Sequence, residues 1–187
     1  MGSPCEILLR GEDFAFSTAL AEKLEKEIAR LERRYSRFLP DSITSQLNTL
    51  AGSGKTLSID DETAALLDYA NTCYQQSEGL FDITSGSLRQ LWNYQQLADQ
   101  QTLPDSEQIN HALEKTGWHK VRWQQGEFAL PVAGMEIDFG GIVKEYAADC
   151  VACLAEREGI VSGMVELGGD IRIFGADSMT AEPEYSP

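Results

Sequence analysis

The sequence predicts an α+β fold, in which helices pack on a mixed or antiparallel sheet. Two observations predict this class: segments with helical periodicity alternate with short β-prone segments, and three β-prone segments follow one another between two of the helices. Strands that are both clustered and interleaved with helices are typical of α+β proteins. With 187 residues, of which 42% are hydrophobic and 24% charged, the chain is long enough to bury its own core.

The first half of the chain is predicted to begin with a strand and to continue mainly as helices. Its predicted elements are a strand within 1–10, a helix over 14–35, a short helix over 43–50, a strand over 56–59 and a helix from about 61 to 77. Apolar residues recur every three or four positions over 14–35, which makes this helix the most secure element. Asp60 supplies cap oxygens for the last helix, and Gly79 ends it.

The second half is predicted to alternate helices with paired strands. Its predicted elements are a helix from 106 to 117, an antiparallel meander of 121–123, 128–130 and 135–139, a helix over 142–158, and strands at 164–167 and 171–174. Gly126 and Gly134 separate the strands of the meander, and Gly168 and Gly169 separate the last two strands. Residues 176–187 contain two prolines and two glutamates and are predicted to be a disordered tail.

The formal net charge of −15 argues against two classes of partner. Because such a charge repels phosphate backbones and no Lys/Arg stripe interrupts it, no nucleic acid partner is expected. No run of about 18 apolar residues spans a membrane and no signal-peptide layout is present, so the chain as written is expected in the cytoplasm. The four cysteines are interpreted as reduced, mostly buried thiols.

Three patterns of known reactive sites are rejected from their context. Residues 52–56 end like a phosphate-binding loop, but Thr49 stands where that loop needs glycine, and the segment runs from a helix into a strand. Cys150 and Cys153 have the spacing of a redox or metal pair, but no second pair completes a zinc site, and core packing is the better interpretation. Two histidines and no nucleophile elbow argue against a Ser-His-Asp hydrolase.

Three glycine-containing segments hold the residues that could bind a ligand. Residues 79–88 combine an aromatic ring, a carboxylate and several hydroxyls at a helix start, although this loop could also be only a cap. Residues 137–149 form a strand that ends in a carboxylate and a double glycine, which lets a ligand approach backbone amides. Lys144 opposes the helix dipole there, which suggests a ligand-facing role; a solvent-facing lysine is the alternative. Two glycines within 165–172 mark a bulge or a ligand approach.

Taken in order, these segments resemble the ApbE family of FAD:protein FMN transferases, in its N-terminal and central part only. The matches are Met1-Gly2-Ser3, Ser36-Arg37-Phe38, Ser45-Gln46-Leu47-Asn48, residues 77–84, Leu88-Arg89-Gln90-Leu91-Trp92, residues 138–149 and Leu167-Gly168-Gly169-Asp170. Each match is short, but five or more in the right order are specific. The resemblance implies an ApbE-like (T-fold-like) domain over residues 1–175 that lacks the family's C-terminal part.

The resemblance also implies a reaction and a set of site residues. The reaction is the magnesium-dependent transfer of FMN from FAD to a Ser or Thr hydroxyl of a flavin-acceptor protein, with release of AMP. The positions that match the family's flavin pocket are Met1, Phe38, Leu80, Phe81 and Asp82, and those that match its nucleotide-facing positions are Asp138 and Lys144. The Gly141 carbonyl falls where the family places a magnesium ligand, and no catalytic residue is assigned.

The sequence departs from the family pattern in three places. Glu145 stands where the family usually has glycine, and Glu166 where it usually has asparagine. The C-terminal part, which in the family carries an Asp and a Thr as further metal ligands and a nucleotide-contacting His, has no counterpart in this sequence. A second chain or protomer is therefore expected to complete the site. Family members are often exported to the periplasm, which leaves the compartment open.

Two other functions stay open from the sequence. A non-catalytic flavin-binding or partner-binding module is favoured by the missing metal-ligand segment. Residues 82–87 partly resemble the acceptor motif that these enzymes modify, so the chain could itself be flavinylated, although Leu88 replaces the final hydroxyl residue of that motif.

Overall fold

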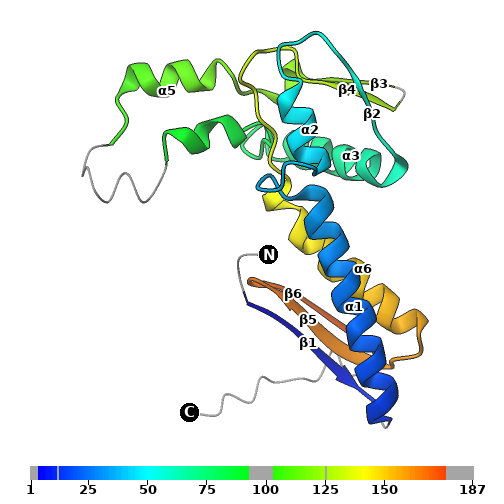
Figure 1. Cartoon of the computed structure of the whole chain (residues 1–187). Helices are drawn as coiled ribbons and strands as arrows, with labels where there is room; N and C mark the ends of the chain where they lie inside the picture. The colour runs from blue at the N-terminus through cyan, green and yellow to red at the C-terminus, as the bar shows by residue number, and fades with distance from the viewer. Residues whose placement is uncertain (1–3, 12, 93–102, 125, 176–187) are drawn as a thin grey trace. The chain divides into compact units, whose positions relative to one another are not determined.

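The computed structural model describes residues 4–11, 13–92, 103–124 and 126–175 (Figure 1). These residues form two compact units: unit 1 comprises the described residues up to Arg33 and from Ile142 onward, and unit 2 comprises Arg34–Gly141. Each unit combines helices with a three-stranded antiparallel sheet, so the predicted α+β class is confirmed. The predicted tail, residues 176–187, lies outside the described residues.

The sheet of unit 1 has the order β1-β5-β6. Its strands are β1 (Cys5–Arg10), β5 (Ser162–Leu167) and β6 (Asp170–Gly175), close to their predicted positions. Gly168 and Gly169 connect β5 to β6 with φ angles of 64° and 100°. Two successive residues with positive φ are what a tight two-residue hairpin requires, so glycine is needed at both positions.

Two helices complete unit 1. The helix α1 (Phe14–Tyr35) has the predicted bounds, and only its last two residues belong to unit 2. The helix α6 (Val143–Arg157) packs on β5 and β6. Its buried positions are mainly small: Ala147, Ala148, Val151, Ala152 and Ala155. Small side chains let the helix approach the sheet closely, and the Gly159 φ of 96° ends it as predicted.

The prediction that the cysteines are mostly buried is wrong. All four are free thiols, but Cys5 and Cys153 are exposed and the other two are only half-buried. On α6, Cys150 and Cys153 are not among the buried positions, which form one stripe of the helix at Ala147, Ala148, Val151, Ala152 and Ala155. The interpretation of this pair as core packing therefore fails for Cys153.

One face of the unit 1 sheet remains open among the described residues. Leu8, Met164 and Ile173 lie opposite one another on neighbouring strands. Leu8 and Ile173 are exposed, and the three side chains line a hollow of about 410 Å³. This face is apolar enough to pack against further polypeptide.

Unit 2 contains shorter elements around a second sheet of order β2-β4-β3. Its elements are α2 (Ile43–Thr49), β2 (Leu57–Ser58), α3 (Asp61–Gln76), η1 (Gly86–Gln90), α5 (Ser106–Leu113), η2 (Trp118–Lys120), β3 (Arg122–Gln124), β4 (Glu127–Ala129) and η3 (Phe139–Gly141). The helix predicted over 106–117 ends earlier, because residues after Leu113 form a hydrogen-bonded turn. A reciprocal capping box between Asp105 and Gln108 starts that helix.

The predicted third strand of the meander, residues 135–139, is absent from the described sheet, and β2 takes its place. Met135, Ile137 and Phe139 are buried and alternate as a strand would, which explains the prediction. The backbone of Ile137 pairs instead with the Asn48 amide: Nδ2 donates to the Ile137 carbonyl at 3.0 Å and the Ile137 N–H donates to Oδ1 at 2.8 Å. The Asn48 side chain therefore makes the two backbone hydrogen bonds that a neighbouring strand would make with Ile137.

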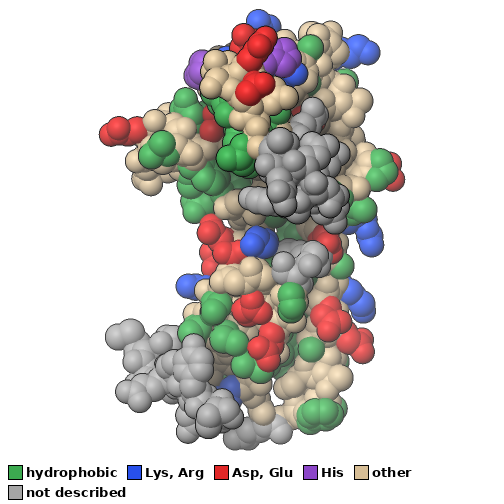
Figure 2. Space-filling view, turned by 90° about the vertical axis from the view of Figure 1, so that its left-hand side faces the viewer, with side chains coloured by type: hydrophobic (Ala, Val, Ile, Leu, Met, Phe, Trp, Pro, Cys, Tyr) green, Lys and Arg blue, Asp and Glu red, His purple; other side chains and the backbone are tan. Residues whose placement is uncertain are grey.

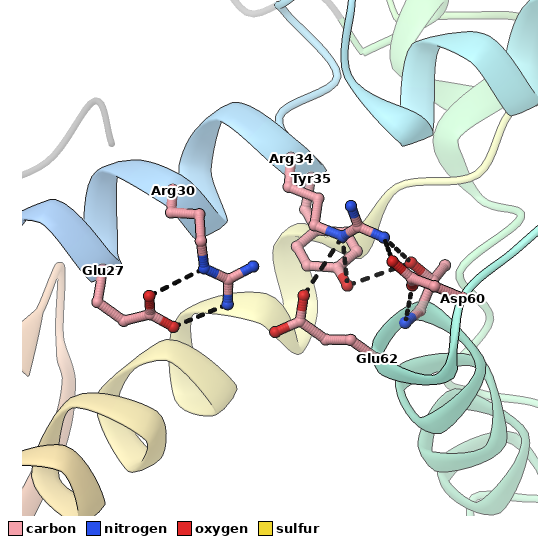
Figure 3. Close-up of polar contacts among 7 residues, drawn as sticks. Glu27, Arg30, Arg34, Tyr35, Asp60 and Glu62 are labelled. Carbon is pink, nitrogen blue, oxygen red and sulfur yellow. Dashed lines mark hydrogen bonds and ion pairs between the residues drawn. The ribbon is translucent and has the colours of Figure 1, made fainter.

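A cluster of polar side chains joins the end of α1 to the start of α3 within unit 2 (Figure 3). Asp60 caps α3 by accepting a hydrogen bond from the Thr63 N–H at 2.9 Å, and its other oxygen pairs with Arg34. The buried Tyr35 hydroxyl lies 3.3 Å from the Thr63 hydroxyl. Burial raises the pKa of Tyr35 despite hydrogen bonds from Thr63 and Arg34 that act to lower it. Tyr35 is therefore a neutral phenol in the folded chain at physiological pH.

Replacing Asp60 with alanine is expected to lower the free energy of unfolding by about 1 kcal/mol at neutral pH, since a helix loses its N-cap. Burial acts to raise the pKa of Asp60, but the hydrogen bonds from Thr63 and the Arg34 charge outweigh it and lower the pKa. This stabilisation is complete above the unfolded-state pKa of about 4 and is lost as pH falls through the lower folded pKa.

Urea unfolding of wild type and variant at several pH values measures this difference. Asp60→Asn is the control, because asparagine caps a helix without titrating. A wild-type advantage over the alanine variant that does not shrink below about pH 4 would contradict this account of Asp60.

Candidate functional site

Two of the matched segments lie side by side in unit 2. The Asp138 N–H donates to the Ile83 carbonyl at 2.8 Å, and Ser85 and Glu136 form a parallel bridge. A Cβ on Gly86 would stand 2.7 Å from the Glu136 carbonyl oxygen, so only glycine fits there. The loop that carries Leu80, Phe81 and Asp82 is thereby attached to the segment that carries Asp138.

Two further matched segments join the same place. Arg37 forms an ion pair with the Asp138 carboxylate, and Asn48 holds the backbone of Ile137. The Ser45 hydroxyl donates to the Arg37 carbonyl at 3.3 Å. Four matched segments, far apart in the sequence, therefore meet around Asp138 in unit 2.

Two of the predicted flavin-pocket residues are exposed apolar side chains. Phe38 is 73% exposed and Leu80 is 93% exposed. Neither contributes to the core, so each is available to a ligand with a planar apolar ring. Phe81 is half-buried, and its ring stands against Gly141, where a Cβ would lie 3.2 Å from a ring carbon.

The Asp82 carboxylate accepts hydrogen bonds from Thr84 in its own loop and from the backbone of Trp118. One oxygen accepts from the Thr84 N–H at 2.7 Å and from the Thr84 hydroxyl at 2.6 Å. The other accepts from the Trp118 N–H at 2.9 Å, and the Gly117 N–H donates to the Thr84 hydroxyl oxygen. Asp82 therefore fixes the shape of its loop, and its contact with a flavin stays a prediction.

The hydroxyls of residues 82–87 bear on whether the chain could be a flavin acceptor. Thr84 and Ser87 are both buried, and the Ser87 hydroxyl donates to the Thr84 carbonyl at 3.3 Å. Buried and bonded hydroxyls cannot reach an incoming phosphate without unfolding this loop. The structure thus disfavours modification at these two positions and leaves only Ser85 exposed.

Asp138 and the glycines after it form the second part of the site. One Asp138 oxygen accepts from the Gly140 N–H at 2.9 Å, and the other pairs with Arg37. The side chain is about a quarter exposed, so the fixed carboxylate can still meet a ligand. Gly141 ends η3, and its carbonyl is the predicted metal ligand.

In unit 1, Lys144 lies in the first turn of α6. Its Nζ is 3.0 Å from the Asp170 carboxylate and 3.5 Å from the Gly168 carbonyl. The N-cap of this helix is Ile142, which makes no side-chain cap hydrogen bond. Lys144 is therefore paired within unit 1, and its ligand-facing role stays a prediction.

Two residues show what sequence reasoning missed in unit 1. Asp170 belongs to the matched segment that begins at Leu167, but only the fold brings it to Lys144. Glu166, a departure from the family pattern, accepts a hydrogen bond from the Gly169 N–H at 2.6 Å and so supports the hairpin turn. Met1, the remaining predicted pocket residue, lies outside the described residues.

The residues of the described ranges do not by themselves fit a magnesium ion. Within those ranges, no three His, Cys, Asp or Glu side chains gather as a metal site. Magnesium takes about six oxygen ligands, and the Gly141 carbonyl would supply one.

The surface carries both signs of charge. On the face that Figure 2 shows, Lys and Arg side chains are interspersed with Asp and Glu and form no continuous basic stripe.

None of the helices built from the described residues has both the length and the apolar character that crossing a bilayer needs.

Comparison with known proteins decides the family. A family model described as the ApbE family matches residues 1–183. The chain belongs to the ApbE family. It is 28% identical over 159 residues to a FAD:protein FMN transferase of Chlamydia pneumoniae, covering 84% of this chain and 49% of that protein. It is 31% identical over 142 residues to one of Treponema pallidum, covering 72% of this chain and 38% of that protein.

Solved ApbE structures share the fold. The flavin transferase ApbE of Vibrio cholerae superposes with a TM-score of 0.83 at 25% identity, covering 94% of this chain and 57% of its own. The ApbE protein of Thermotoga maritima gives a TM-score of 0.82 at 28% identity, covering 93% and 56%. This ApbE chain thus spans about half the length of the curated relatives that it matches.

Proposed function

We propose that this chain binds FAD through unit 2 and takes part in the transfer of FMN from FAD to a Ser or Thr hydroxyl of a flavin-acceptor protein. The observation that carries the proposal is the meeting of four matched segments around Asp138. The relatives named FAD:protein FMN transferase support it. The roles of the unit 2 residues Phe38, Leu80, Phe81, Asp82 and Asp138 are part of this proposal. The nucleotide-facing role of Lys144, which lies in unit 1, and the flavin-pocket role of Met1 stay as what the family resemblance implies.

The rate of this transfer depends mainly on how the protein positions the FAD. In the transfer, the acceptor oxygen forms a bond to the FMN phosphorus, the bond from that phosphorus to the bridging oxygen breaks, and AMP leaves. The acceptor hydroxyl proton passes to solvent. Phe38 and Leu80 would cover the flavin ring and exclude water, and the fixed Asp138 carboxylate would accept a hydrogen bond from the ligand.

Magnesium and a second polypeptide form the finer part of the proposal. Since the described residues supply too few metal ligands, the side chains that complete a magnesium site are proposed to come from outside them, on another chain or protomer. The open apolar face of the β1-β5-β6 sheet supports such an association, because Leu8 and Ile173 are exposed there. Without that partner, the chain would act as a flavin-binding module.

Incubation with FAD, Mg²⁺ and an acceptor protein tests the transfer. Covalent flavin on the acceptor and equimolar AMP are expected when the C-terminal half of a longer ApbE relative is supplied, and both should vanish on chelation with EDTA. Stoichiometric FAD binding without AMP release in any mixture would reject transfer and leave the binding module. No flavin binding at all would reject both functions.

A further inference from the structure

Arg37 makes two contacts with residues assigned to the flavin site. Its guanidinium pairs with the Asp138 carboxylate, and its Cζ lies 4.8 Å from the centre of the Phe38 ring. Phe38 is otherwise a highly exposed side chain on the turn after α1. One planar cation therefore restrains both a carboxylate and an aromatic ring.

Among the described residues, the guanidinium meets the Asp138 carboxylate and the Phe38 ring. Its Nε is buried and has no hydrogen-bond partner among the described residues. A buried donor without a partner is unfavourable, so the side chain does not take this orientation to satisfy Nε. The Asp138 pair and the Phe38 stack are the described contacts that hold the guanidinium plane in this orientation.

The other end of Asp138 is held as well. The Gly140 N–H binds the carboxylate oxygen that Arg37 does not pair with, and the Ser45 hydroxyl binds the Arg37 carbonyl. With both oxygens restrained, the carboxylate has one orientation while Arg37 is present. Removal of Arg37 frees one oxygen and also the exposed ring of Phe38.

We propose that Arg37 is a positioning residue for flavin binding, which presents the Phe38 ring and the Asp138 carboxylate to the ligand in one fixed arrangement. This inference rests on the proposed function. Its physical basis is preorganisation: a ring and a carboxylate that are already placed need no ordering when the ligand binds.

The chain offers a matched control for Arg37. Arg34, three residues earlier, pairs with an aspartate, Asp60, and lies 5.5 Å from the ring of the next residue, Tyr35. The side chains of Arg34 and Arg37 are 29% and 27% exposed. Arg34 thus makes the same kinds of contact at the same depth, but with residues outside the assigned site.

FAD binding by the full chain, followed by flavin fluorescence, tests the proposal. Arg37→Met is expected to raise the dissociation constant about 10- to 100-fold, because displacing positioned groups costs about that much. Arg34→Met should leave it unchanged, even though the variant is less stable. Arg37→Lys keeps the charge but not the planar stack and should bind with intermediate affinity.

A double-mutant cycle separates positioning from general stability. Because Arg37 holds Phe38 as well as Asp138, Arg37→Met should have a smaller effect in an Asp138→Asn background than in the wild type, but not none, so the two effects are non-additive. Additive effects, or an Arg37→Met variant that binds FAD like wild type, would overturn the proposal. A wild-type chain that binds no FAD would overturn the proposed function, and this inference with it.

Discussion

Replacing Phe139 with alanine is expected to lower the free energy of unfolding of unit 2 by about 3–5 kcal/mol, the usual cost of emptying a large aromatic site in a core. Phe139 is 0% exposed and meets Tyr35 edge to face, with ring centres 5.3 Å apart. It also stands between Asp138 and the two glycines of η3. The cavity would therefore loosen the segment that places the Asp138 carboxylate.

Urea unfolding followed by circular dichroism measures this loss. Phe14→Ala is the control, because that phenylalanine is 86% exposed and its removal should change stability by no more than about 0.5 kcal/mol. A loss below about 1 kcal/mol for Phe139→Ala would mean that the residue is not a core residue of this fold.

The double variant Phe38→Ala with Leu80→Ala is expected to weaken FAD binding by about 100-fold or more. Stacking of an aromatic side chain on a nucleotide base contributes about 1–3 kcal/mol, and covering a leucine contributes a similar amount. Both side chains are exposed in the described structure, so the free energy of unfolding should not change. The double variant is therefore expected to lose affinity for FAD while its free energy of unfolding stays that of the wild type.

Flavin fluorescence titration and urea unfolding of the same samples measure the two quantities. Leu113→Ala is the control, because Leu113 is an exposed leucine of unit 2 outside the assigned site. If the double variant bound FAD with wild-type affinity, Phe38 and Leu80 would have no part in the flavin pocket.

Local patterns were sufficient for the long elements of the fold. The apolar spacing of α1 predicts its bounds from Phe14 to Tyr35, and Asp60 marks the start of α3. Residues 135–139 show the limit of this reasoning. Their alternation is that of a strand, but Asn48, 89 residues from Ile137 in the sequence, takes the place of a strand partner. No local pattern reports such a contact.

The candidate site, like the fold, could be predicted from the sequence only in part. The resemblance supplies the assigned residues one by one, but it does not show what holds them. Arg37 and Asp138 are 101 residues apart in the sequence, and Lys144 meets Asp170 only through the hairpin turn. The double engagement of Asp82 by Thr84 and Trp118 also depends on the fold. These contacts hold the side chains of the matched positions in place, and no local sequence pattern predicts them.

Titration of the purified full chain with FAD, followed by flavin fluorescence and by calorimetry, tests the central claim most directly. The account predicts saturable binding of one FAD per chain, weakened in the Phe38→Ala, Leu80→Ala double variant and unchanged in Leu113→Ala. Binding that does not saturate, or equal binding by all three proteins, would contradict a flavin site built around Phe38, Leu80 and Asp138.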